Sequence, residues 1–270
     1  MKKIKSMLGV ALSLVMLFSS CAQTDEVGSG QGLLNVSLKS GTELFVGTRA
    51  VDEASYNNLG NYTVQVTDAN GLTKLQCPGD ELSANMPLTL LIGGYTVKAY
   101  TGEEYKDVAY SRDGFYVEGE TAVNILGDDR QNVSVTCTPT FGRVSVNFDT
   151  QKMSTYYQDY NVTFSGTDAM GSDVITWAKD DTEPWYVRLN PTEETINFTI
   201  TTTIKKEYVE GNGTSQRKSG TFKLSRNKAY KLNISPVYTP TDQGKLDINI
   251  TIDDSTNDSE YDTEVDIDWI

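Results

Sequence analysis

Residues 61–71 of the chain read Asn-Tyr-Thr-Val-Gln-Val-Thr-Asp-Ala-Asn-Gly, and residues 159–171 echo them as Asp-Tyr-Asn-Val-Thr-Phe-Ser-Gly-Thr-Asp-Ala-Met-Gly. Each stretch alternates apolar and polar residues and then ends in an Asp-Ala-x-Gly turn. Alternation with a period of two is the pattern of a β-strand that buries one of its faces. The shared order therefore predicts two copies of one β-structured unit.

Two further features mark the limits of the units. Thr138–Thr140 and Thr239–Thr241 both read Thr-Pro-Thr, and a glycine opens an alternating strand at Gly32, Gly142 and Gly244. Proline and glycine interrupt strand pairing, so the first unit should end near Pro139. We predict two tandem antiparallel β-sandwich domains, residues 32–139 and 140–270, each within the usual size of a domain.

The rest of the chain agrees with an all-β fold. Alternating runs recur from residue 33 to residue 269, with turn residues between them, and no amphipathic helix of useful length is evident. The last two runs, residues 246–252 and 265–269, are expected to form a hairpin whose loop is residues 253–262.

The N-terminus is typical of a secretory signal. Three lysines in the first five residues precede the apolar run Met7–Phe18 and then Ser19-Ser20-Cys21. The run is shorter than the roughly 20 residues of a membrane-spanning helix. A cysteine directly after two small residues resembles the bacterial lipobox, although Phe18 stands where leucine is usual.

This resemblance predicts a lipoprotein signal peptide over residues 1–20 and lipid attachment at Cys21. Residues 21–31 are polar and glycine-rich, as in a flexible tether. The acidic pair Asp25-Glu26 resembles the surface-export signal of Bacteroidetes lipoproteins. We therefore expect an outer-membrane lipoprotein at the cell surface, held to the membrane by its N-terminal lipid.

Composition excludes several classes of function. The formal charge is −14, and removal of residues 1–20, which hold three lysines and no acid, leaves −17. Such a body is a poor partner for nucleic acid. The chain has no histidine, the commonest general base and transition-metal ligand. Its paired carboxylates do not follow a calcium-loop pattern. We expect no enzymatic activity, no cofactor and no metal.

Two sets of residues leave alternatives open. Cys77 and Cys137 could form a disulfide in an oxidising compartment, or could be two buried thiols. Trp177, Trp185 and Tyr186 could form an exposed aromatic platform for a glycan, or could belong to the core, where such side chains are usually found.

Several motifs together resemble a family of two-domain lipoproteins from Bacteroidetes, which is itself similar to the fimbrillins and the fimbrial anchor or tip proteins of that phylum. The motifs span most of the mature chain: Cys21, the strand 32–39, Thr48-Arg49-Ala50, residues 62–71, residues 91–97 and the final Asp266-Ile267-Asp268-Trp269. The resemblance implies a transthyretin-like sandwich in each domain and a role in fimbriae or adhesion, with pilin subunits or a host ligand as partners.

The same resemblance raises the question of proteolytic processing. In shaft-forming fimbrillins a protease cuts after an arginine in the region of Arg49-Ala50, the first strand leaves, and a strand of the next subunit fills the groove. The strand 262–270 would then be the candidate donor. Cleavage at Arg49 would also remove Cys21, so retention of the first strand, as in an anchor or tip subunit, is the favoured interpretation. A glycan-binding lipoprotein is the alternative function.

Overall fold

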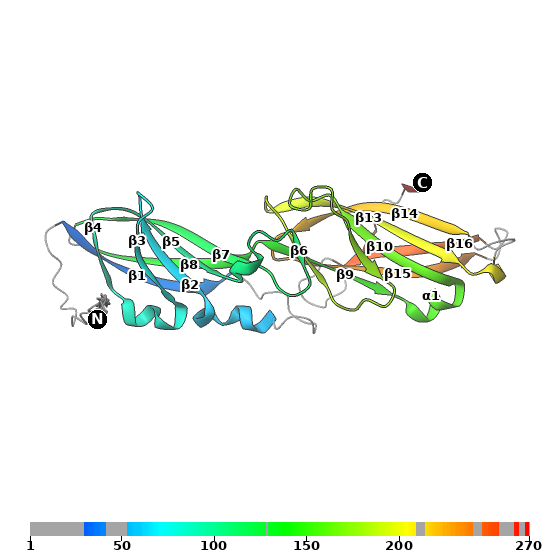
Figure 1. The fold of residues 1–270 in the computed structure, drawn as a ribbon, viewed down its shortest axis with the longest axis horizontal. Helices are drawn as coiled ribbons and strands as arrows, with labels where there is room; N and C mark the ends of the chain where they lie inside the picture. Colours follow the sequence, from blue (N-terminus) through cyan, green and yellow to red (C-terminus); the bar gives the residue numbers. More distant parts are fainter. Residues whose placement is uncertain are drawn as a thin grey trace, which may run out of the picture.

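The structure is a computed structural model, and it describes residues 30–41, 53–127, 129–208, 214–239, 245–253, 262–264 and 268–269. These residues form mostly β-strands, which confirms the all-β prediction. The strands lie in two lobes arranged end to end (Figure 1). We call described residues 30–139 lobe 1 and described residues 141–269 lobe 2. Cys21, Arg49 and Ala50 lie outside the described residues.

Lobe 1 contains eight strands and four short 3-10 helices. The strands are β1 (Gln31–Ser40), β2 (Thr63–Asp68), β3 (Thr73–Pro78), β4 (Leu88–Leu91), β5 (Gly93–Thr101), β6 (Tyr110–Ser111), β7 (Val117–Ile125) and β8 (Arg130–Pro139). The 3-10 helices are η1 (Glu53–Asn57), η2 (Leu59–Asn61), η3 (Gly79–Asn85) and η4 (Glu103–Tyr105).

Lobe 2 contains the remaining strands, one α-helix and one 3-10 helix. Its elements are β9 (Phe141–Phe148), α1 (Thr150–Tyr156), β10 (Tyr157–Ser165), β11 (Ile175–Ala178), β12 (Trp185–Arg188), β13 (Glu193–Ile204), η5 (Lys206–Tyr208), β14 (Ser215–Ser225), β15 (Ala229–Thr239), β16 (Lys245–Asp253), β17 (Asp262–Glu264) and β18 (Asp268–Trp269).

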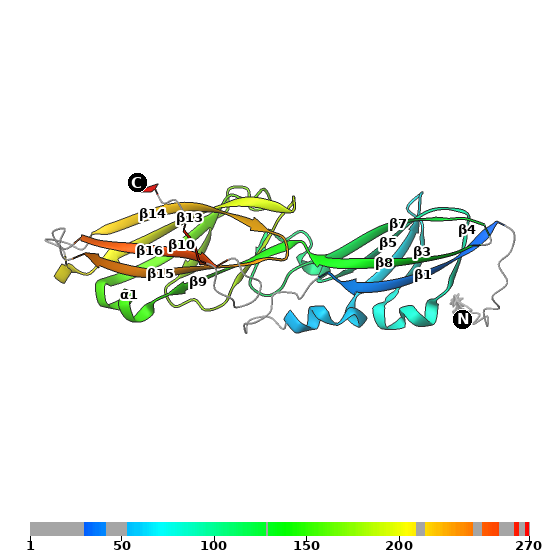
Figure 2. The same cartoon turned by 180° about the vertical axis from the view of Figure 1, so that it is seen from behind.

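The two lobes share one strand order. Lobe 1 forms a sheet in the order β3-β2-β5-β7-β8-β1-β4. Its two parts, β3-β2-β5-β7 and β8-β1-β4, join through two residue pairs at the ends of β7 and β8, and they lie as two layers (Figure 2). Lobe 2 repeats the first part as β11-β10-β13-β14 and the second as β15-β9-β12. This is the repeat that residues 61–71 and 159–171 predict.

In each lobe the two layers enclose one hydrophobic core. The alternating residues of β1, β2, β5 and β8 fill the first core, and those of β9, β10, β13, β15 and β16 fill the second. The first core also takes in Tyr186 and Ala229 from lobe 2. We propose that the domain boundary falls at Pro139–Phe141, where the chain leaves β8 for β9, close to the predicted division at 139/140.

Strand pairing is antiparallel with two exceptions. The first strand of each lobe runs parallel to the last strand of the repeat, β1 beside β8 and β9 beside β15. Alternation in the sequence identifies strands but does not state which strands are neighbours or in which direction they run. The parallel pairs are therefore findings of the structure.

The glycines that open each first strand have a steric reason. A Cβ on Gly32 would lie 2.5 Å from the carbonyl oxygen of Leu126, and a Cβ on Gly142 would lie 2.6 Å from Cγ of Leu224. In both lobes the first strand passes the end of a strand in the opposite layer, β7 in lobe 1 and β14 in lobe 2. Only glycine leaves enough room for this approach.

The structure decides one open alternative and corrects one expectation. Cys77 and Cys137 are both buried and both free, as in the second alternative, in which the thiols serve as small core side chains. The predicted C-terminal hairpin is found only in part, because β16 pairs with residues 262–264 of β17, whereas residues 268–269 pair elsewhere. A single C-terminal strand over residues 262–270 is wrong, however, since β17 extends one sheet of lobe 2 and β18 pairs with β14 in the other.

Candidate functional site

The predicted aromatic residues lie near the junction of the two lobes, on β11 and β12. Trp177 is 1 % exposed because the alternation of β11 turns it into the core of lobe 2. Tyr186 is fully buried because it packs into the core of lobe 1, while the next residue, Val187, packs into the core of lobe 2. Trp185 is half-buried. These three residues do not form an exposed platform, and the core interpretation holds for Trp177 and Tyr186.

A cation from lobe 1 covers the tryptophans. The guanidinium carbon of Arg112 lies 4.3 Å from the ring centroid of Trp185 and 5.5 Å from that of Trp177. Its Nη2 donates to Oδ2 of Asp181 at 2.7 Å. Arg112 follows β6, a two-residue strand of lobe 1 that pairs with β12 and so extends a sheet of lobe 2. Aromatic stacking and the ion pair together fix this segment on lobe 2.

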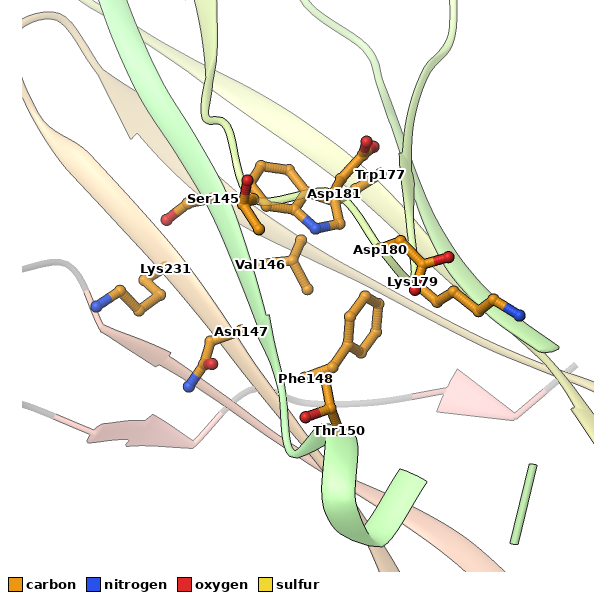
Figure 3. A pocket seen from close by; sticks show the side chains of 11 residues that line it. Ser145, Val146, Asn147, Phe148, Thr150, Trp177, Lys179, Asp180, Asp181 and Lys231 are labelled. Atoms are coloured by element: carbon orange, nitrogen blue, oxygen red, sulfur yellow. The ribbon is translucent and has the colours of Figure 1, made fainter. Parts of the chain in front are cut away.

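A cavity of about 540 Å³ lies beside β9 and Trp177 (Figure 3). Its inner wall is apolar and consists of Val146, Phe148 and Trp177, whereas its rim is polar. The rim residues are Ser145, Asn147, Thr150, Lys179, Asp180, Asp181, Thr182 and Lys231. An apolar floor with convergent amide, hydroxyl and charged groups is typical of a small-ligand site.

Trp177 contributes its ring to the wall of this cavity, but not its indole nitrogen. Trp177 Nε1 is buried without a hydrogen-bond partner and is closed to water, so an oxygen in the cavity does not reach it. The apolar surface of the ring is therefore what Trp177 offers to a ligand.

The shortness of β12 explains why the cavity is open. β12 pairs with residues 141–144 of β9 only, and among the described residues no strand pairs with residues 145–148 on that side. The cavity therefore runs along an unpaired strand edge, which could also accept an extended peptide.

The lobe junction itself holds a buried ion pair. Glu53 is 7 % exposed, accepts a hydrogen bond from the hydroxyl of Tyr186, and contacts Nη1 of Arg143 at 3.1 and 3.3 Å. Burial raises the pKa of Glu53, whereas the hydrogen bond from Tyr186 and the charge of Arg143 act in the opposite direction. The pKa of Tyr186 is also raised, mainly by burial. This cluster ties η1 of lobe 1 to β9 and β12 of lobe 2.

Sequence reasoning identified neither Arg112 nor Glu53. Arg112 lies 69 residues from its partner Asp181, and Glu53 lies 90 residues from Arg143. Within the described ranges no group of three or more metal-ligating side chains is found. None of the helices in the same ranges has both the length and the apolar character needed to cross a membrane.

Residues 30–267 match the model of a family described as a domain of unknown function, DUF4493. The match covers most of the chain, which therefore belongs to this family. A search of curated proteins found no match.

Several solved structures resemble the chain at low identity. A Bacteroides eggerthii protein to which a cell adhesion role has been attributed is 14% identical, with a TM-score of 0.45 over 86% of this chain and 98% of that one. A fimbrial assembly protein of Parabacteroides distasonis is 10% identical, with a TM-score of 0.42 over 90% and 100%. The fimbrial anchor protein Mfa2 of Porphyromonas gingivalis is 13% identical, with a TM-score of 0.37 over 83% and 98%.

Proposed function

We propose that the protein is a non-catalytic lipoprotein of the cell surface that serves as a fimbrial or adhesive component. An anchor or accessory subunit fits better than a shaft subunit. The solved structures above carry descriptions of the same class, but their similarity to this chain is too low to decide its function. The proposal rests on the export and lipidation pattern that ends at Cys21, together with the place of β1.

The place of β1 is the observation that favours retention of the N-terminus. β1 is the middle strand of the layer β8-β1-β4, with eight residue pairs to β8 and four to β4. It buries Leu34 and Val36 in the first core. Loss of β1 would separate β4 from β8 and expose this apolar surface. A subunit that keeps β1 also keeps Cys21 and its lipid, as an anchor requires.

The native protein tests this proposal directly. Mass spectrometry of protein from cell envelopes should find a mature chain that starts at acylated Cys21, and affinity purification after crosslinking should recover pilin subunits with it. Protease added to intact cells should degrade it. A chain that starts at Ala50, within a ladder of polymers, would instead identify a processed shaft subunit.

Glycan binding is the second candidate, and the cavity beside Trp177, with its apolar wall and polar rim, favours it. A sugar ring would pack on the apolar wall while the rim residues contact its hydroxyls. Asn147 on the rim contacts Asn233 at 3.0 Å, and the same ladder recurs in lobe 1 as Asn35 with Asn132 at 2.9 Å. The repeat therefore supplies a matched control far from the cavity.

A glycan array on the purified protein, followed by titration of any hit, tests this candidate. Asn147→Ala should weaken saturable binding about tenfold, the value of one or two hydrogen bonds, while Asn35→Ala leaves it unchanged. Equal effects of the two substitutions, or no saturable binding, would exclude a glycan site in this cavity.

A further inference from the structure

Four exposed apolar side chains gather at the outer end of lobe 1, the end away from lobe 2. They are Leu72 (61% exposed), Leu91 (64%), Ile92 (54%) and Leu126 (51%). We call these four residues the apolar tip. Exposed large hydrophobic side chains elsewhere in the described residues stand at scattered positions: Val174, Tyr208 and Val237.

Strand register brings the four residues together. Leu72 lies in the turn between β2 and β3, and Leu126 lies in the turn after β7. Leu91 ends β4, and Ile92 lies in the turn between β4 and β5. Asp68 pairs with Tyr95 and Gly93 pairs with Ile125, so the three turns share one end of the lobe. Figures 1 and 2 both show this end as the one farthest from lobe 2.

The chain enters lobe 1 at the same end. Gln31, the first residue of β1, pairs with Leu91, and the carbonyl of Gly30 accepts a hydrogen bond of 3.1 Å from the amide of Ile92. From Cys21 to Gly30 the chain has nine residue steps, which cannot span more than about 30 Å. A lipid on Cys21 therefore confines the apolar tip to the neighbourhood of the bilayer.

Charge does not oppose contact with lipid at this end, although the body is strongly acidic. The three turns with their flanking residues hold Lys74 and Arg130 against Asp68, Asp128 and Asp129, a formal charge of −1. The carboxylate of Asp68 pairs with Lys74 at 3.0 Å. This small charge contrasts with the −17 of the whole mature chain.

We propose that the apolar tip inserts into the interface of the bilayer that holds the lipid on Cys21. The inference rests on the proposed lipidation and adds a second contact to it. Four aliphatic side chains at the boundary of headgroups and acyl chains remove apolar surface from water, as membrane-surface proteins do. The second contact holds lobe 1 against the membrane and directs lobe 2 away from it.

Tryptophan quenching in vesicles measures the insertion. The native acylated protein is reconstituted into vesicles of phosphatidylethanolamine and phosphatidylglycerol with brominated acyl chains. Leu72→Trp places a reporter in the tip, and Val174→Trp places one in the equivalent turn of lobe 2, between β10 and β11, where the side chain is also exposed. Insertion of 5–10 Å should quench the Leu72→Trp reporter about twofold and leave the Val174→Trp reporter unaffected.

A second measurement separates this proposal from lipidation itself. The mature chain from residue 21 with Cys21→Ala lacks both the apolar run Met7–Phe18 and the lipid, so its cosedimentation with the same vesicles depends on the tip alone. Leu91→Ser and Ile92→Ser should each weaken that partition by about tenfold, whereas both chains stay folded because these side chains are exposed.

The outcomes are distinct. If mass spectrometry finds no acyl group but Leu91→Ser still weakens cosedimentation, lipidation fails and the tip stands. If acylated chains stay on the vesicles while both reporters remain unquenched, the tip proposal is overturned. The Leu72→Trp reporter could instead be shielded from water in solution without vesicles, in a chain that associates as its concentration rises. That result would overturn the proposal in favour of a contact between copies of the chain.

Discussion

The outer end of lobe 1 and the matching end of lobe 2 are built from the same turns but differ in what covers them. Ile92 follows β4 and is 54% exposed, whereas Leu189 follows β12, the equivalent strand, and is 0% exposed. In lobe 2 this end faces the connection to lobe 1, and the amide of Leu189 donates to the carbonyl of Thr140. The comparison teaches that lobe 1 covers this end of lobe 2, whereas no described residue covers the same end of lobe 1.

The lobes differ also along their sheet edges. In lobe 2, β6 from lobe 1 lies beside β12, β16 lies beside β15, and β18 lies beside β14. The corresponding strands of lobe 1 are β4, β8 and β7. Among the described residues β4 is an edge strand, and β7 and β8 pair with each other at their ends instead of gaining a further strand. Lobe 2 is thus completed partly by lobe 1. The following predictions test how far each lobe depends on that arrangement.

The largest effect is expected from Glu53→Ala, which breaks the junction. The substitution removes the Glu53 carboxylate from the guanidinium of Arg143 and from the hydroxyl of Tyr186. Loss of one partner of a buried pair should lower the free energy of unfolding by about 3–5 kcal/mol, as measured by urea titration. Glu193→Ala removes an exposed pair with Lys223 and should cost less than about 1 kcal/mol.

Equal costs for the two substitutions would show that the lobes do not depend on the junction. If Glu53→Ala moves one shared unfolding transition to a lower urea concentration, the two lobes unfold together. Two separate transitions would show that only the contact between them is lost.

The second largest effect is a pH dependence of stability that only the core of lobe 1 should show. Both core cysteines belong to lobe 1, and burial raises the pKa of Cys137 to about 11 from its usual value near 9. The folded state thus keeps a proton that the unfolded state loses. Stability from the neutral thiol is complete below about pH 9 and falls by roughly 2–3 kcal/mol as the pH rises to about 11.

Cys137→Val removes this titration. The difference in unfolding free energy between wild type and Cys137→Val should therefore change between pH 8 and pH 11 by about 2–3 kcal/mol, while lobe 2, which contains no cysteine, contributes nothing to it. A pH-independent difference would mean that Cys137 ionises as easily in the folded chain as in the unfolded one.

The opening glycines offer a comparison at equivalent positions. Gly32→Ala places a Cβ against a backbone oxygen, and Gly142→Ala places one mainly against the side chain of Leu224. Overpacking of this kind costs about 1–3 kcal/mol, and Gly32→Ala should lie at the upper end because a backbone atom yields less than a side chain. Thermal unfolding of both variants measures the order. The reverse order would show that β1 adjusts more easily than β9.

The sequence alone was sufficient for part of this structure. The repeat of residues 61–71 and 159–171 correctly predicted the strands β2 and β10 and the turns that follow them, because alternation and turn residues are local properties. The parallel pairs, the free thiols and the division of the C-terminal strand depend on partners far along the chain. The sequence also left open whether Trp177 is buried, because Arg112 and the facing layer, which cover it, lie far from it along the chain.

The smallest effect concerns Arg112, which joins the two lobes through Trp185. Arg112→Lys keeps the positive charge beside Asp181 but loses the planar group that lies over the ring. The free energy of unfolding should fall by about 0.5–1 kcal/mol, because the site is partly exposed. Lobe 1 contains no tryptophan, so tryptophan emission reports on lobe 2 alone. Arg112→Lys should shift this emission to longer wavelength as water reaches Trp185. Lys98→Arg, which changes a cation paired with Glu118 near Tyr100 within lobe 1, should leave the emission unchanged. An unchanged spectrum for Arg112→Lys would mean that β6, rather than the arginine, keeps water from the tryptophan, and lobe 2 would then depend on lobe 1 through backbone pairing alone.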